Sequence, residues 1–224
     1  MVYSWLLVQS ACVALASGIL DDTGPVHIVE PCCGNGILTA STTFLRSPHT
    51  TTSVGIDRDP ERTQRFHTVM ATVGQSLPGF KLDIADVRYS SFDGPTQVPT
   101  YILAKHACGP ATDIILDRIG SGDIPNLCAS VIATCCHGTA QECIPSALAS
   151  SGAVTPSEWH QLAKFADWVT ASGVPEEIAT IGRVAMRVMD CLRITALPDH
   201  ISSHVTELFP SSVSRKNHGI VMTT

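Results

Sequence analysis

The chain has 224 residues, a mass of 23.8 kDa and a formal net charge of −6, with 44% hydrophobic and 15% charged residues. This composition excludes an intrinsically disordered protein, and the sequence has no uninterrupted run of about 18 apolar residues that would cross a bilayer. We therefore expect one soluble domain over residues 1–224. The negative charge argues against strong non-specific binding of nucleic acid, which requires clustered lysine and arginine.

The N-terminal segment SWLLVQSACVALASG has the length of a signal peptide, but no basic residue precedes it, and Gln9 and Ser10 interrupt the apolar run. Its apolar residues recur at helical spacing, so we interpret it as a helix packed on a core. The nine cysteines, in a sequence without a secretory signal, fit a reducing compartment, where disulfides are rare. We expect an intracellular protein of the cytoplasm or nucleus.

Seven short runs rich in β-branched and apolar residues follow along the chain. The first five alternate with helical segments, which predicts an α/β fold with a parallel sheet covered by helices on both faces. The last two are separated by too little apolar sequence for a long helix, which predicts a closing hairpin. The expected strands are His27–Glu30, Ser53–Asp57, Lys81–Ile84, Thr100–Ala104, Val131–Thr134, Leu192–Ala196 and Gly219–Met222. A mostly parallel, seven-stranded sheet with an antiparallel last strand is the Rossmann-like arrangement of S-adenosylmethionine methyltransferases.

The segment HIVEPCCGNGILTA places a buried strand, an acidic residue, a glycine pair and a helix start in succession. In a doubly wound sheet this first strand-to-helix turn lies where ligands bind. Gly34 and Gly36 permit a close approach of the backbone, and Glu30 is placed to accept hydrogen bonds from a ligand's ammonium or from nearby backbone amides. A glycine-bearing turn without a ligand is the alternative interpretation.

Two further strand ends carry acidic residues. Asp57 ends the second strand, where a carboxylate binds both ribose hydroxyls of an adenosine-type ligand. Asp83, at the end of the third, is placed to contact the adenine side. The sequence has neither a GKS or GKT phosphate loop nor a full GxGxxG turn, so a ligand without phosphates such as S-adenosylmethionine fits better.

The segment YILAKHACGPATD follows the fourth strand and brings Lys105, His106 and Asp113 to the same edge of the sheet. A desolvated lysine or histidine can deprotonate or orient a ribose hydroxyl, which is poorly acidic. A solvated strand-end cation is the alternative interpretation of Lys105.

The fifth strand ends in VIATCCHG, next to the fourth strand in the usual strand order, so Cys135, Cys136 and His137 are expected close to Lys105 and His106. Small buried thiols that fill a crowded sheet end are the simplest interpretation of the two cysteines. We predict no metal site, because adjacent residues of a strand point to opposite faces.

These segments resemble the Trm13 family of tRNA 2′-O-methyltransferases. AKHACGPATDIIL is similar to the family's KHLCGxATDL, VIATCCHG to ALCCHH, and VEPCCGNG to VEFGAGxG. VGIDRDPERTQRF, KLDIADV, FADWVT, IGRVAMRVMDCLR and HGIVMTT match further family segments, so the resemblance covers nearly the whole chain. It implies that S-adenosylmethionine supplies a methyl group to the 2′-hydroxyl of the fourth acceptor-stem nucleotide of some tRNAs.

The sequence departs from the family pattern at three places. Cys32, after Pro31, replaces the first glycine of the cofactor turn and could narrow the methionine pocket, so we include it among the cofactor-binding candidates. Gly138 replaces the second histidine of the CCHH segment. The family's N-terminal zinc modules have no counterpart here, so we expect the catalytic domain alone.

Weak, salt-dependent binding of tRNA is expected, because the chain is acidic and its cations are few. Two other functions stay open: methylation of another substrate, and a degenerate domain that binds RNA or a partner without chemistry. We expect RNA phosphates to contact Arg58, Arg183, Arg187 and Arg193, with Arg62, Arg65, Arg215 and Lys216 as further candidates.

Overall fold

The computed structural model describes residues 24–46, 50–62, 64–65, 67, 79–105, 107–141, 143–169, 171, 173–212 and 214–224. The predicted N-terminal helix and His106 lie outside these residues. Within the part of the chain that the structure describes, no helix is long and apolar enough to span a membrane.

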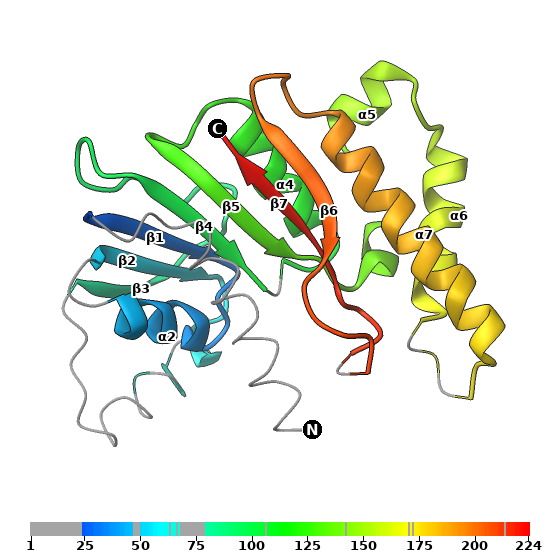
Figure 1. Ribbon diagram of the computed structural model, residues 1–224, viewed down its shortest axis with the longest axis horizontal. Coiled ribbons are helices and arrows are strands. Elements are labelled where there is room, and N and C mark those ends of the chain that lie inside the picture. Colours follow the sequence, from blue (N-terminus) through cyan, green and yellow to red (C-terminus); the bar gives the residue numbers. More distant parts are fainter. Residues whose placement is uncertain are drawn as a thin grey trace.

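The core of the molecule is a seven-stranded sheet in the order β3-β2-β1-β4-β5-β7-β6 (Figure 1). All pairings from β3 to β5 are parallel, and β7 is antiparallel to both of its neighbours. The strands are β1 Val26–Pro31, β2 Thr50–Asp57, β3 Phe80–Ile84, β4 Thr100–Ala104, β5 Leu127–Ala133, β6 Ser202–Glu207 and β7 His218–Thr223. The helices are α2 Ile37–Arg46, α4 Pro110–Gly120, α5 Ser146–Ser151, α6 Pro156–Asp167 and α7 Glu176–Thr195, with a short 3₁₀ turn η1 at His137–Ala140.

The predicted mostly parallel sheet, the antiparallel last strand and the neighbouring positions of the first, fourth and fifth strands are confirmed. The predicted strand Leu192–Ala196 is wrong, because residues up to Thr195 continue α7. The partner of β7 in the closing hairpin is instead β6, with the sequence SSHVTE. As a half-exposed edge strand, β6 lacks the apolar run by which the other strands were predicted.

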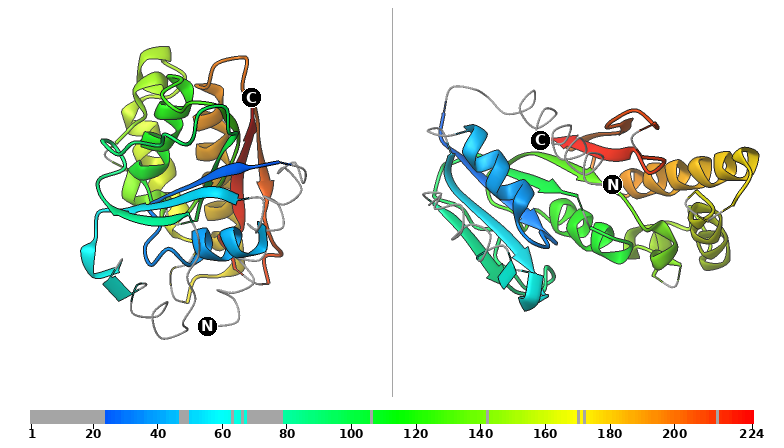
Figure 2. Two further views of the ribbon diagram at one scale, coloured as in Figure 1. Left: turned by 90° about the vertical axis from the view of Figure 1, so that its left-hand side faces the viewer. Right: turned by 90° about the horizontal axis from the view of Figure 1, so that it is seen from below.

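Alternate residues of the central strands pack into two hydrophobic cores, one on each face of the sheet. In β4, Ile102 faces the core that contains Ile115 of α4, whereas Leu103 faces the core that contains Leu38 of α2. Helices α2 and α4 accordingly lie on opposite faces (Figure 2). The carboxyl ends of the parallel strands carry the buried residues Glu30, Asp57 and Lys105.

A third core lies among α5, α6 and α7, beyond the β5 side of the sheet. Its centre is Trp159, which is fully buried and donates its indole N–H to the carbonyl of Ala140 at 2.8 Å. Helix α6 begins with a capping box formed by Thr155 and Glu158. This core holds α7 beside the carboxyl end of β5, where Thr134 contacts Asp190, and beside the first turn of α4, where Asp113 contacts Arg193.

Candidate active site

The turn after β1 is held by its own acidic residue. Glu30 is buried and accepts hydrogen bonds from the backbone N–H of Thr39, at 2.7 Å, and from the Thr39 hydroxyl. Thr39 lies in the first turn of α2, where backbone N–H groups have no partner within the helix. Of the two roles predicted for Glu30, the structure therefore shows the contact with a backbone amide. Burial raises the pKa of Glu30 to about 7, against the opposing effect of these hydrogen bonds.

The glycines of this turn are required for different reasons. Both Gly34 and Gly36 have positive φ, and a Cβ on Gly36 would meet Cδ2 of Leu82 at 2.7 Å. The N–H of Gly34 donates to Asp57 Oδ2 at 2.7 Å, which ties the turn to the end of β2. Cys32 adopts a φ of 59°, a conformation that favours glycine and that a side chain rarely takes.

A cavity of about 460 Å³ opens beside this turn at the carboxyl ends of β2 and β3. Asp57 lines it from the end of β2, while its two oxygens accept N–H groups of Gly34 and Asp59. Cys32 and Cys108 form part of its wall, and Ile114 of α4 adds an apolar surface. Burial raises the pKa of the Cys32 thiol to about 12, so this group is neutral. The volume lies in the range of small-molecule sites.

The acidic residue on the β3 side of the cavity is Asp86 rather than the predicted Asp83. Asp83 shares the exposed face of β3 with Lys81, to which it is paired at 2.9 Å, and it is not part of the lining. Asp86 follows two residues after the strand and lines the cavity. Arg88 binds both of its oxygens, at 3.0 and 2.7 Å, and lowers the pKa of Asp86 to about 2. The sequence prediction stopped at the strand and missed the turn that follows it.

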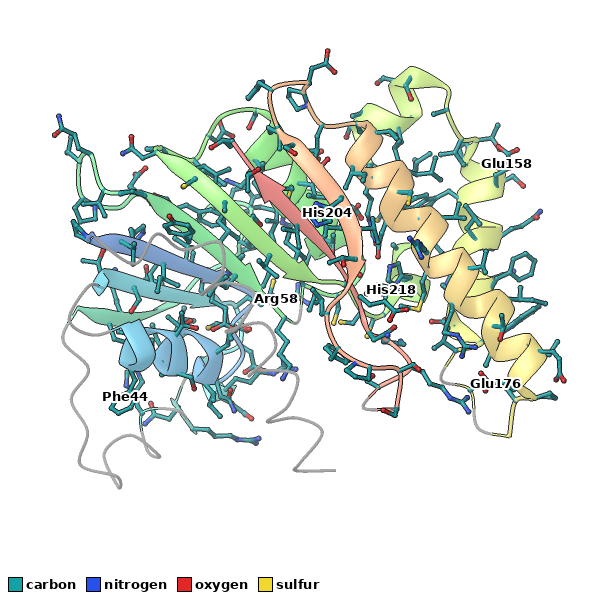
Figure 3. All side chains as sticks on the ribbon, in the orientation of Figure 1. Phe44, Arg58, Glu158, Glu176, His204 and His218 are labelled. Carbon is teal, nitrogen blue, oxygen red and sulfur yellow. The ribbon has the colours of Figure 1, made fainter. Side chains whose placement is uncertain are left out.

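Three arginines lie around the same cavity. Arg58 and Arg62 come from the segment after β2, and Arg88 comes from the turn after β3. Arg58 is exposed, and Figure 3 shows it at the carboxyl edge of the sheet. Arg62 is paired with Asp59 at 3.0 Å. The cavity therefore combines two carboxylates with a basic rim.

Lys105, the predicted base, lies directly after β4 and has 6% of its surface exposed. Its charge lies close enough to Glu30 to oppose the rise of the Glu30 pKa. A buried lysine next to a buried carboxylate fits the desolvated environment that was predicted, although Lys105 is not among the residues that line the cavity. The predicted partner His106 lies outside the described residues.

Asp113, also predicted for the reaction site, is bound by Arg193 instead. The Arg193 guanidinium donates to both oxygens of Asp113, at 2.7 and 3.0 Å, and to Asp190 at 3.0 Å. Burial raises the pKa of Asp113, against the opposing effect of Arg193. Asp190 also accepts hydrogen bonds from His137 and Thr134, at 2.9 and 2.7 Å. This network joins α4, α7 and the end of β5.

The prediction that Arg193 contacts RNA is wrong, because only 2% of its surface is exposed and its charge is neutralised inside the protein. The physical reason is the helix period: six residues separate Arg187 from Arg193, which turns the side chain by about 240° around α7. Arg187 is exposed, whereas Arg183 is half-buried and paired with Glu176 at 2.7 Å. Arg215 is paired with the same carboxylate at 3.4 Å.

Cys135 and Cys136 were predicted to point to opposite faces of the sheet, but their sulfurs lie on the same side. Cys135 forms an isolated parallel bridge with Cys108, and Cys136 adopts the left-handed conformation, with a φ of 48°. This turn brings the sulfurs of Cys108, Cys135 and Cys136 within 4.8 Å of one another. The premise used to exclude a metal ligand set at this place is therefore wrong.

The family model described as methyltransferase TRM13 matches residues 16–178, more than half of the chain. The chain belongs to this family. Two curated relatives are similar over about half of the chain. The glutathione S-transferase C-terminal domain-containing protein of Mus musculus is 32% identical over 124 residues, and the tRNA:m(4)X modification enzyme TRM13 of Schizosaccharomyces pombe is 30% identical over 131 residues.

These alignments cover 53% and 52% of the chain but only 19% and 35% of the two relatives, so the chain corresponds to a part of each. Among solved structures, TrmN from Thermus thermophilus superposes with a TM-score of 0.52 at 14% identity, over 96% of this chain and 48% of that one. The plantazolicin methyltransferase BpumL, solved with SAH, gives 0.51 at 11% identity, over 97% and 83%. At these identities the likeness shows a methyltransferase fold.

One departure from the TRM13 pattern now has a structural explanation. A Cβ on Gly138 would collide with the carboxylate of Asp167, at the end of α6. A histidine at this position would therefore require the exposed side chain of Asp167 to move aside. Its neighbour His137 keeps a buried partner, Asp190.

Proposed function

We propose that this member of the TRM13 family binds S-adenosylmethionine in the cavity beside Cys32 and Asp57. It transfers the methyl group to RNA, and its substrate is the 2′-hydroxyl of the fourth acceptor-stem nucleotide of tRNA. The observation that carries the proposal is the position of the cavity. It lies at the carboxyl ends of the strands, at the switch point of a methyltransferase-type sheet, and Asp57 ends the second strand there.

Different residues are proposed to bind the cofactor and the RNA substrate. Asp57 accepts two N–H groups and has lone pairs left for ribose hydroxyls, because a carboxylate has about four acceptor positions. Asp86 supports the adenine side. Glu30 and the glycines shape the turn that contacts the methionine part. Arg58 on the rim binds an RNA phosphate, and the exposed Arg187 is a further phosphate contact, whereas Arg62 and Arg88 are already paired with Asp59 and Asp86.

The family to which the chain belongs, and the tRNA-modifying activity named for the Schizosaccharomyces pombe relative, support tRNA as the substrate. The 2′-hydroxyl and the acceptor stem rest on the sequence resemblance. Lys105 is the proposed base or hydroxyl-orienting group, because it is buried directly after β4, and a desolvated lysine can accept a proton from a ribose hydroxyl or orient that hydroxyl.

Cofactor binding is tested by calorimetry with S-adenosylmethionine and two aspartate variants. We expect Asp57→Ala to weaken binding by some tens-fold, since loss of a charge-assisted hydrogen-bonding group costs about 2–3 kcal/mol. Asp83→Ala is the matched control, because Asp83 is paired with Lys81 outside the cavity, and its affinity should equal that of the unmodified chain. Equal effects of the two substitutions would contradict the placement of the ligand.

The substrate is tested by transfer of a labelled methyl group to total tRNA, followed by mapping of the modified nucleotide. We expect label on the ribose of one acceptor-stem nucleotide. Cofactor binding without any transfer to tRNA would point to another substrate, and absence of cofactor binding would point to a degenerate domain.

The role of Lys105 is tested with single-turnover rates at saturating tRNA. Lys105→Ala should lower the rate by about a hundredfold or more, the contribution typical of a general base, with little change in cofactor affinity. An unchanged rate would exclude Lys105 from the reaction.

A further inference from the structure

Three thiols converge where the fourth and fifth strands end, outside the turn that binds the proposed cofactor. Cys108 precedes α4, and Cys135 and Cys136 follow β5. The sulfurs of Cys108 and Cys135 are 2.9 Å apart, and all three sulfurs lie within 4.8 Å of one another. Each of the three residues is half-buried.

The backbone around these thiols is held in place by contacts that do not involve sulfur. The N–H of Thr139, at 3.0 Å, and its hydroxyl, at 2.8 Å, both donate to the carbonyl of Cys136, which fixes the left-handed turn. Gly109 has a φ of 54°, and a Cβ there would collide with Thr139, so the segment after Cys108 packs tightly on the turn after Cys136. The N–H of Gly109 donates to the carbonyl of Cys135 at 3.5 Å.

Behind the turn, His137 is anchored by Asp190 at 2.9 Å. The Arg193 network holds Asp190 and also reaches the carbonyl of Gly109, at 3.4 Å. Both turns that carry the thiols are therefore fixed by the same buried ion pairs. A ligand set that is positioned in advance in this way needs little reorganisation to bind.

We propose that Cys108, Cys135 and Cys136 bind one thiophilic divalent cation, Zn²⁺, through three thiolates. Sulfurs on a tetrahedron with Zn–S bonds of about 2.3 Å are about 3.8 Å apart. The three sulfurs need to move by only about 1 Å to reach that geometry. Among the described residues no fourth ligand joins this group, so the fourth position is taken by water or another exchangeable ligand.

A disulfide between Cys108 and Cys135 is the competing use of these thiols. It would leave Cys136 without a role, and it would need an oxidant. The strained backbone of Cys136, which turns its sulfur towards the other two, is explained by a ligand that requires all three thiols.

The site borders the proposed cofactor cavity, because Cys108 lines that cavity as well. The cation site is nevertheless independent of the proposed function, because its residues and its readout do not involve S-adenosylmethionine. The two proposals can therefore fail separately.

The test uses the full chain, kept reduced, stripped with a chelator and then titrated with Co²⁺. We expect one equivalent to bind per chain, with a thiolate-to-cobalt charge-transfer band and the visible bands of a tetrahedral site, and Zn²⁺ should displace it. Cys108→Ser, Cys135→Ser and Cys136→Ser should each weaken binding by more than about a hundredfold, since loss of an outer-shell partner alone costs 10- to 100-fold.

Cys143→Ser and Cys191→Ser are matched controls, because both cysteines are exposed and lie outside the cluster. They should bind Co²⁺ as the unmodified chain does, and circular dichroism checks that every variant is folded. The proposal is overturned if the unmodified chain shows no thiolate–cobalt band or if a control variant loses the band. It is also overturned if thiol titration without reductant shows a Cys108–Cys135 disulfide in the metal-free protein, and if the reduced protein then fails to bind cobalt.

Discussion

At the carboxyl ends of β1 and β2, Glu30 and Asp57 accept hydrogen bonds from uncharged backbone and hydroxyl donors. Beyond β4 and β5, by contrast, Asp113 and Asp190 are both paired with Arg193. The first half of this edge adjoins a cavity of about 460 Å³, and its carboxylates keep acceptor capacity for a ligand. In the second half the protein supplies its own counter-ion.

A charged residue at the end of a parallel strand is therefore not by itself evidence of a ligand site. Whether such a carboxylate is available to a ligand depends on whether another helix or strand supplies a cation that pairs with it. Helix α7 does so for Asp113, across 80 positions of sequence, whereas the segments around Asp57 contribute only backbone N–H groups. The second half of the edge joins α4, α7 and β5, and the first half is where we propose that the cofactor binds.

The largest effect is expected from removing the cation that distinguishes the two halves. Arg193→Met should lower the free energy of unfolding by about 3–5 kcal/mol, because it leaves two buried carboxylates without their counter-ion. Urea denaturation measures this change. The matched control is Arg187→Met on the exposed side of the same helix, with an expected change of at most about 0.5 kcal/mol. Similar losses in both variants would show that the network contributes little.

A second prediction concerns Glu30, whose hydrogen bonds come from uncharged donors. Burial raises the pKa of Glu30 from 4.5 to about 7, so its carboxyl ionises at higher pH in the folded chain than in the unfolded chain. Its contribution to stability is therefore complete below about pH 4.5 and is lost as the pH rises through about 7. At about 1.4 kcal/mol per pKa unit, the loss amounts to about 3 kcal/mol.

Glu30→Gln removes this titration but keeps an acceptor for the N–H of Thr39. The stability of the unmodified chain minus that of the variant should therefore decrease by about 3 kcal/mol between the two pH limits, as measured by urea denaturation at each. Groups common to both proteins cancel in the difference. A difference that stays constant with pH would mean that the pKa of Glu30 is the same in the folded and the unfolded chain.

Much of the sheet could be predicted from the sequence, because buried parallel strands are short apolar runs that alternate with helices. Thr100–Ala104 was predicted with its observed limits, and β1, β2, β3 and β7 to within about three residues at either end. The strand Ser202–Glu207 could not be found in this way, since an edge strand with an exposed face has a polar composition.

At the site, the local pattern placed Glu30 in the first strand and Asp57 at the end of the second, because both residues belong to the short apolar runs that predict these strands. The prediction of an RNA contact at Arg193 is wrong, because its partner Asp113 comes from a distant segment of the chain. The predicted adenine contact at Asp83 lies outside the cavity, because the Asp83 side chain is on the same face of β3 as Lys81 and is paired with it. The cysteine turn failed for a different reason. The left-handed conformation of Cys136 is rare for a residue with a side chain and is not indicated by the sequence.

The smallest effect is expected for the arginines of the cavity rim, where a substitution should change only the salt dependence of RNA binding. Arg58 is exposed at the cavity, whereas Arg183 is already neutralised by Glu176 on α7. If the first half of the edge is the binding half, Arg58→Ala should reduce the slope of log affinity against log salt by about 0.7 to 0.9, the value of one phosphate contact. Arg183→Ala should leave the slope nearly unchanged. Because Glu176 already neutralises Arg183, this side chain contacts no phosphate and displaces no counter-ion from the RNA. The measurement is titration of a labelled acceptor-stem duplex at several salt concentrations, without cofactor. A larger change for Arg183→Ala than for Arg58→Ala would move the RNA-binding surface from the cavity rim to α7.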